Sequence, residues 1–406
     1  MRWTLARVLL VLGGLGMGGV ETYMVRLARE LSLQGHHVDV VLLSGKADAK
    51  LLSKLSEVAE IFVHEKFSFL ASSSWINSCI PFNSLVNRFY DIVHVVDIMT
   101  LGFVYFNRKA INFSSLSIGI YHSKEISWWR DRTCYFRGRL VELYDANVDL
   151  TLSPSESVAL LASRLTGASV TDIPILPLGI ELDAYKSAAP SKDSLRLISV
   201  GRLVDFKTYN KNLILSLAEL RKTAPFEYYV YGDGPERKSL EALSLSLGVS
   251  DFVHFMGEVE YSELKSVLNG AFCFIGSGTT IIEASAAGIP SVVGIESMEL
   301  PLTCGYFADV EGFSYNEGEA TTSRVRIVDV VKKLYEMCDE EYMACSERHR
   351  LKASQFDIKK TVNGFVTLTS KAPRFSMGIN RWASLLSFFI SLVRFGPSAL
   401  RSRFDS

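Results

Sequence analysis

Short apolar runs alternate along this chain with glycine-rich loops and with segments whose apolar residues recur every three or four positions. The run at residues 8–12 leads into a loop with glycines at 13, 14, 16, 18 and 19. Residues 20–31 then have helical spacing, and a second apolar run covers 38–43. Apolar runs of this length are typical of strands buried on both faces. The segment therefore predicts a strand, a loop, a helix and a second, parallel strand.

The same rhythm recurs through the chain. Apolar runs return at 92–96, 116–121 and 150–152, and the polar stretch 186–194 is typical of a linker. The pattern then starts again, with apolar runs at 195–200, 228–231, 252–255 and 271–275. This order predicts an α/β protein of two Rossmann-like domains, whose parallel sheets face a central cleft. We expect the domains to span residues 1–185 and 186–370, followed by a basic, apolar tail at 371–406.

Length and composition agree with two globular domains. The chain has 406 residues, more than one ordinary core accommodates, and 48% of them are apolar. The formal net charge of −1 argues against a nucleic-acid partner. The six cysteines are scattered without metal-binding spacing, so we expect reduced thiols and a cytoplasmic location.

The N-terminal apolar run has a second interpretation, as a signal peptide. It is rich in glycine, lacks a small-residue cleavage pattern and leads directly into a helical pattern, so a buried first strand is favoured. No segment reaches the roughly 20 apolar residues that span a bilayer. Any membrane contact is expected to be peripheral.

The most informative stretch is the loop after the apolar run 271–275. It reads Gly276-Ser277-Gly278-Thr279-Thr280, and a short helical pattern that carries Glu283 follows it. Small residues at the start of a helix allow an anion to approach unpaired backbone N–H groups, and a carboxylate one turn further on can accept hydrogen bonds from sugar hydroxyls. The alternative is a capping box between Thr280 and Glu283. Taken alone, the segment leaves both interpretations open.

Gly14, Gly16 and Gly19 have the spacing of a dinucleotide fingerprint, which makes an NAD-dependent enzyme an alternative. The second predicted strand ends in Leu42-Leu43-Ser44, without the acidic residue that would hold the adenosine ribose. The fingerprint would also leave the C-terminal motifs unexplained. We therefore do not favour a dinucleotide site.

Five motifs over residues 8–365 together resemble those of group 1 glycosyltransferases, the retaining family of GT-B fold. They are Gly13-Gly14 through Glu21, Gly201-Arg202-Leu203 with Lys207, Gly232-Asp233-Gly234-Pro235, Phe255-Met256-Gly257, and Glu283 through Pro290. The resemblance implies a nucleotide-sugar donor on the C-terminal domain and a glycan or lipid-linked acceptor on the N-terminal domain. It also implies that no separate cofactor takes part.

The resemblance assigns roles to individual residues. It implies that His122, Arg202 and Lys207 are catalytic, with the two cations neutralising the donor diphosphate, and that Glu283 binds the nucleotide ribose. The remaining residues that it implies in donor binding are Gly16, Gly18, Gly19, Gly278, Thr279 and Thr280.

The chain departs from the family pattern at one position. A second glutamate is often found eight positions before the ribose-binding one, and here that position is Ile275. Ser277, Thr279 and the loop N–H groups are candidates to replace it. No Asp-x-Asp sequence occurs, so we expect a metal-independent reaction. The loss leaves a non-catalytic glycosyltransferase-like binding partner as an alternative. A nucleotide-sugar epimerase or phosphorylase of the same fold is another.

The tail combines basic residues with an apolar segment. Six cations at 371, 374, 381, 394, 401 and 403 face a single carboxylate at 405, and residues 382–393 are mostly apolar. Such a helix suits the surface of an anionic membrane. Together with the resemblance, it implies a role in bacterial surface polysaccharide biosynthesis, at the inner face of the cytoplasmic membrane. The alternative is that it packs back on the N-terminal domain. The sequence leaves both open.

Overall fold

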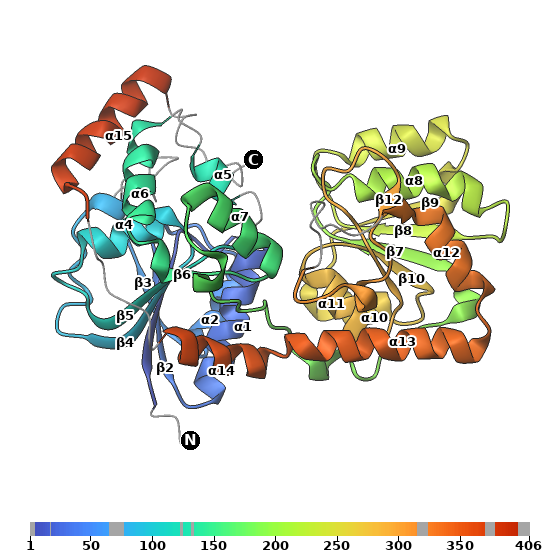
Figure 1. Cartoon of the computed structure of the whole chain (residues 1–406), viewed down its shortest axis with the longest axis horizontal. Coiled ribbons are helices and arrows are strands. Elements are labelled where there is room, and N and C mark those ends of the chain that lie inside the picture. Colours follow the sequence, from blue (N-terminus) through green and yellow to red (C-terminus); the bar gives the residue numbers. More distant parts are fainter. Residues whose placement is uncertain are drawn as a thin grey trace. The chain divides into compact units, whose positions relative to one another are not determined.

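The computed structural model describes residues 5–16, 18–64, 77–121, 125–130, 134–314, 324–369 and 378–396. The chain forms two compact units (Figure 1). The N-terminal unit consists of residues 1–179 and 358–406, and the C-terminal unit of residues 180–357. The domain boundaries after residues 185 and 370 remain predictions.

The N-terminal unit is built on a six-stranded sheet in the order β3-β2-β1-β4-β5-β6, with every neighbouring pair parallel. Residues 8–12 of β1 are all apolar, and they are almost fully buried because helices cover both faces of the sheet. The strands are β1 (Arg7–Leu12), β2 (His37–Leu42), β3 (Glu60–Val63), β4 (Phe89–Val95), β5 (Asn112–Gly119) and β6 (Thr151–Leu152).

The helices of this unit form two groups (Figure 1). α1 packs against α2 and α14, while α6 packs against α4, α5 and α15. The helices are α1 (Gly19–Leu33), α2 (Ala49–Ser56), α4 (Ile98–Phe106), α5 (Glu125–Trp129), α6 (Tyr135–Asp145), α7 (Glu156–Thr166), α14 (Ile358–Thr369) and α15 (Arg381–Phe395). No helix within the described ranges is both long and apolar enough to cross a membrane.

The C-terminal unit repeats the plan with a five-stranded parallel sheet in the order β11-β10-β7-β8-β9. In Figure 1 this sheet lies between α8, α9 and α12 on one face and α10, α11 and α13 on the other. Its strands are β7 (Arg196–Val200), β8 (Glu227–Tyr231), β9 (Val253–Gly257), β10 (Cys273–Gly276) and β11 (Ser291–Val293). Its helices are α8 (Tyr209–Leu220), α9 (Arg237–Ser246), α10 (Leu264–Leu268), α11 (Thr279–Ala286), α12 (Ile327–Glu336) and α13 (Asp339–Ala353).

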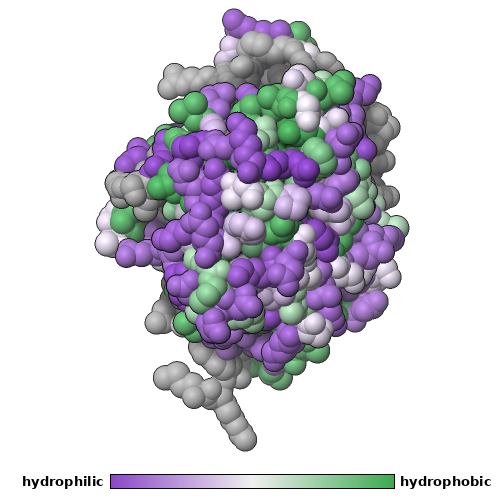
Figure 2. All heavy atoms as spheres, turned by 90° about the vertical axis from the view of Figure 1, so that its right-hand side faces the viewer, coloured by the Kyte–Doolittle hydropathy of each residue, from purple (hydrophilic) through white to green (hydrophobic). Residues whose placement is uncertain are grey.

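A short antiparallel ribbon completes the unit, with β12 (Leu302–Thr303) paired to β13 (Val325–Arg326). The surface that Figure 2 shows, on the right-hand side of Figure 1, is largely hydrophilic, with hydrophobic residues in small separate areas. The two parallel sheets confirm the fold class predicted from the apolar runs.

Candidate functional site

The loops that follow β7, β8 and β9 are joined by backbone contacts, and the glycines of the motifs make these contacts possible. Gly201 N–H donates to Tyr231 O at 2.9 Å, and Gly232 N–H donates to Gly257 O at 2.6 Å. Gly232 has φ +133°, and a Cβ built on it would lie 2.1 Å from Gly201 O. No side chain fits at that distance. The motif glycines therefore serve to bring three strand ends together.

The loop after β10 supplies the N-terminus of a helix. Gly278 is the N-cap of α11, with φ +70°, and no side chain of the described residues caps this end. Thr280 does not take part in a capping box, because its hydroxyl donates to Ser277 O at 3.0 Å and to Val200 O at 3.3 Å. The N–H groups of the first turn, from Thr279 onward, are therefore left to an external acceptor. The capping interpretation of the sequence is excluded.

Glu283 lies one turn into α11, where only 1% of its surface is exposed. The helix then ends as the sequence predicts, since Gly288 has φ +77° and its N–H donates to Ser285 O at 2.9 Å. A carboxylate held this deeply has a fixed position.

Arg202 and Lys207 are brought together beside the end of β7. Arg202 is exposed, and Lys207 folds back so that its Nζ lies 2.8 Å from the Cβ position of Gly201. Burial lowers the pKa of the Lys207 ammonium, an effect that the Glu296 carboxylate opposes and the Arg202 cation reinforces. Two cations at close range repel each other unless an anion lies between or beside them. Here the Glu296 carboxylate offsets part of this repulsion.

Glu296 is a member of this group that the sequence interpretation missed. It follows β11, and its Oε1 accepts a hydrogen bond from Ser277 Oγ at 2.9 Å. Gly294 N–H donates to Gly276 O at 2.7 Å, so the ends of β10 and β11 are held side by side. The signal available in the sequence was a carboxylate just after an apolar run at a predicted strand end.

Ile275 takes no part in this polar group. Its side chain is fully buried in the hydrophobic core of the C-terminal unit. The carboxylate that is hydrogen-bonded to the β10 loop in this chain is Glu296, which follows the neighbouring strand β11. A pocket of about 320 Å³ adjoins Lys207 and is also lined by Lys211, Asp205 and Glu236.

The glycine loop after β1 lies at the carboxyl end of the other sheet. Gly16 and Gly19 have open space at their Cβ positions, whereas Glu21 closes over Gly18. Burial raises the pKa of Glu21, its own backbone hydrogen bond opposes the shift, and the Asp97 carboxylate adds to it. The donor-binding role that the resemblance implies for these three glycines remains a prediction.

His122 falls outside the described residues, and its role remains a prediction. The neighbouring His94 is a core residue, with Nδ1 2.8 Å from Ser117 Oγ and Nε2 2.5 Å from Tyr121 Oη. Burial lowers the pKa of His94 to about 3, so the ring is neutral at physiological pH. It has a structural role in positioning the strand end that precedes residue 122.

The two sheets, with their loops at the carboxyl ends of the strands, define a protein of two nucleotide-binding-type domains. The family described as "Glycosyl transferases group 1" matches residues 183–300, and "Glycosyltransferase Family 4" matches residues 17–184. The matched segments adjoin and together cover most of the chain. The protein belongs to the group 1 glycosyltransferase family.

Two curated relatives are similar over part of the chain. One, from Arabidopsis thaliana, is a component of phosphatidylinositol N-acetylglucosaminyltransferase, and it is 26% identical over 159 residues, which are 36% of this chain and 35% of the relative. Alpha-monoglucosyldiacylglycerol synthase of Acholeplasma laidlawii is 27% identical over 177 residues, 38% of this chain and 44% of the relative. The chain thus spans less than half the length of these two relatives.

Among solved structures, Anabaena Alr3699/HepE in complex with UDP and glucose is similar with a TM-score of 0.60 and 16% identity. The similarity covers 89% of this chain and 98% of that one. At this identity the likeness establishes the fold alone, and it confirms the predicted GT-B fold.

Proposed function

We propose that the protein is a retaining glycosyltransferase that transfers a sugar of the hexose class from a nucleoside diphosphate donor. The observation that carries the proposal is the convergence of Arg202 and Lys207, the uncapped start of α11 and the buried Glu283 in one unit. Cations and backbone N–H groups suit a diphosphate, and a fixed carboxylate suits ribose hydroxyls.

The arrangement also supports a chemical role for the cations. When the glycosidic bond to the donor breaks, negative charge grows on the leaving diphosphate. Preorganised cations at that point stabilise the transition state more than the ground state. Lys207 is held against the backbone of Gly201, so it requires little reorganisation. We propose that these side chains do the work of a divalent metal and that Gly278, Thr279 and Thr280 cradle the phosphates.

The acceptor is proposed to be a glycan or a lipid-linked saccharide, on the N-terminal unit. The names of the two relatives refer to phosphatidylinositol and diacylglycerol lipids, which supports a lipid-linked acceptor. We further propose that the reaction belongs to bacterial surface polysaccharide biosynthesis at the inner face of the cytoplasmic membrane. Peripheral membrane contact through the C-terminal tail would bring the enzyme to such an acceptor.

The test is a screen of the purified full chain against a panel of nucleotide sugars, first by thermal shift and then by release of nucleoside diphosphate in the presence of lipid-linked acceptors. A donor that binds the folded state raises the melting temperature by mass action. We expect one donor class to stabilise the protein and to release nucleotide with an α-linked product. We also expect the rate to be unchanged in chelator.

Two results would redirect the proposal. Stabilisation by a donor without nucleotide release from any acceptor would favour a non-catalytic binding partner, which the loss of a glutamate at Ile275 makes a specific alternative. Conversion of the donor to its epimer without transfer would favour an epimerase.

A further inference from the structure

The outer surface of α15 is apolar, although this helix packs on the N-terminal unit. Five large apolar side chains are between 45% and 88% exposed, and they are Trp382, Leu386, Phe389, Ile390 and Val393. They recur at intervals of four, three, one and three residues, so they lie on one side of a helix of 3.6 residues per turn. We refer to these five residues as the outer face of α15.

The inner side of α15 explains why the apolar residues face outward. Ser391 Oγ accepts hydrogen bonds from the N–H groups of Tyr135 at 3.0 Å and Phe136 at 3.4 Å, which open α6. Phe388 packs on Phe136 with ring centroids 5.5 Å apart. The serine thus supplies the cap that α6 lacks in its own N-cap residue, Cys134. These contacts fix the rotation of α15 and leave the outer face unpacked.

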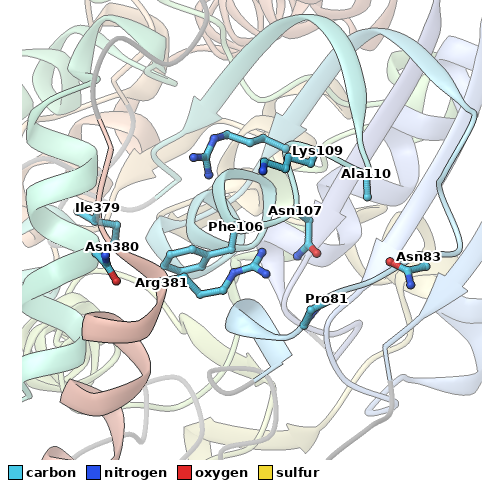
Figure 3. Close-up of a pocket in the computed structure, with 10 residues that line it drawn as sticks. Pro81, Asn83, Phe106, Asn107, Lys109, Ala110, Ile379, Asn380 and Arg381 are labelled. Atoms are coloured by element: carbon cyan, nitrogen blue, oxygen red, sulfur yellow. The ribbon is translucent and has the colours of Figure 1, made fainter.

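A basic pocket lies at the start of the same helix (Figure 3). It has a volume of about 430 Å³, and its cations are Arg108, Lys109 and Arg381. Figure 3 shows the Arg381 side chain passing along Phe106 towards Asn107, and its guanidinium carbon lies 5.7 Å from the Phe106 ring centroid. We refer to the site formed around the three cations as the basic pocket.

The charges of the basic pocket are not compensated. None of its lining residues is acidic, and no carboxylate of the described residues forms an ion pair with the three cations. Arg108 donates to Tyr105 O at 2.8 Å, which uses one of its five N–H groups. Burial lowers the pKa of Arg381, with the Arg108 cation adding to the shift and Cys79 opposing it. Like charges gathered at a concave site favour an anion.

We propose that the basic pocket binds the phosphate headgroup of an anionic phospholipid while the outer face of α15 enters the bilayer interface. Charge selects this occupant, because an apolar face bordered by cations matches an anionic bilayer at both levels. Trp382 follows Arg381 in the sequence and is 77% exposed, and indole rings are favoured at a membrane–water interface. This inference rests on the proposed lipid-linked acceptor for its purpose, but not for its measurement.

The experiment is co-sedimentation of the full chain with vesicles of phosphatidylcholine that contain either 30% phosphatidylglycerol or none, in the absence of donor. We expect binding to the anionic vesicles. The triple variant R108Q/K109Q/R381Q should bind about 100-fold more weakly, at about fivefold for each cation. The double variant L386E/V393E should bind the anionic vesicles at least tenfold more weakly than the parent. The single variant K109Q serves if the triple variant does not fold.

Matched controls lie on the C-terminal unit. The triple variant K222Q/K238Q/K265Q removes the same charge from exposed positions, and L245E changes an apolar residue that is 71% exposed on α9. Both should bind anionic vesicles as the parent does. If K222Q/K238Q/K265Q weakened vesicle binding as much as the basic-pocket variant, net charge alone would explain the binding, and the proposed pocket would be overturned.

Other outcomes would also overturn the proposal. Parental vesicle binding by both site variants would do so, and so would an absence of parental binding to anionic vesicles. A shift in melting temperature with inorganic phosphate that needs the basic pocket, without vesicle binding, would identify a free phosphate site. A dimer that L386E/V393E dissociates would assign the outer face to a second copy of the chain. Turnover on a detergent-dispersed acceptor reports the proposed function separately, so failure of one does not imply failure of the other.

Discussion

Ser277 and Glu296 join the loops of two adjacent strands through a hydrogen bond of 2.9 Å between Oγ and Oε1. The Glu296 carboxylate is thereby held at the β10 loop, and its charge raises the pKa of the Lys207 ammonium. Glu296 thus both supports the loop and favours the charged form of Lys207.

This arrangement predicts opposite pH shifts for two variants. Burial is the largest influence on the lowered pKa of Lys207, Glu296 opposes it and Arg202 adds to it. Lys207 is charged below its folded-state pKa, so binding of a nucleoside diphosphate should weaken as pH rises through that value. E296Q should move the weakening to lower pH, and R202Q should move it to higher pH.

Calorimetric titration of the nucleoside diphosphate between pH 6 and 10 measures both shifts, and E241Q on the exposed side of α9 is the control. Shifts in the same direction for both variants would contradict the opposite effects of Glu296 and Arg202 on the pKa of Lys207.

Loss of either cation should slow the chemical step. R202A and K207A each remove a positive charge at the point where negative charge develops on the leaving diphosphate. A reduction in kcat of about 100- to 1,000-fold is expected. K222A removes an exposed lysine just beyond α8 and should leave kcat unchanged. Single-turnover kinetics with saturating donor distinguish the effect from weaker binding. Near-parental turnover in both variants would favour the non-catalytic alternative.

Glu283→Gln should act on donor binding. The buried carboxylate can accept hydrogen bonds from hydroxyl groups in its charged form, and hydrogen bonds to charged groups contribute about 1.5–3 kcal/mol. We expect the donor Kd to rise about 10- to 100-fold while kcat changes less. The measurement is donor titration by calorimetry, beside a melting curve of the unliganded variant. An unchanged Kd would remove Glu283 from the donor site.

Much of the fold follows from local sequence, whereas part of the site does not. Strands such as β1 and β10 are buried on both faces, so a continuous apolar run was enough to predict them. Glu296 lies in an irregular segment without periodicity, and its position depends on the pairing of β10 with β11. The basic pocket joins Arg108 to Arg381, and only tertiary packing brings residues so distant in sequence together.

α15 shows a different limit of sequence interpretation. Its apolar residues suggested burial or a membrane, but its buried positions are Ser384, Phe388 and Ser391, and its other large apolar side chains include five that are exposed. Ser391 is buried because its hydroxyl caps the start of α6. No pattern within α15 reveals this contact.

The close approach of the motif loops predicts a steric penalty at Gly232. A Cβ there would lie 2.1 Å from Gly201 O, and φ is +133°. Gly248 has φ +65° with no atom within 4 Å of its Cβ position, so G248A isolates the cost of the backbone conformation at about 1–2 kcal/mol. G232A should destabilise the protein by more than that amount, because the loops after β7 and β8 must separate. Urea unfolding of both variants measures the difference, and equal destabilisation would show that the loops are not tightly packed.

Ser391→Ala tests the cap between α15 and α6. Without the hydroxyl, the N–H groups of Tyr135 and Phe136 lose their acceptor, and loss of such a cap costs about 1 kcal/mol. In a unit of this size the melting temperature should fall by about 2–4 °C. Ser387 is the matched control on the same helix, because its hydroxyl donates within α15 to Ser384 O at 2.7 Å. S387A should therefore leave the melting temperature within about 1 °C, by the usual effect of surface substitutions. If both variants melt alike, Ser391 does not anchor α15, and the orientation of its outer face needs another explanation.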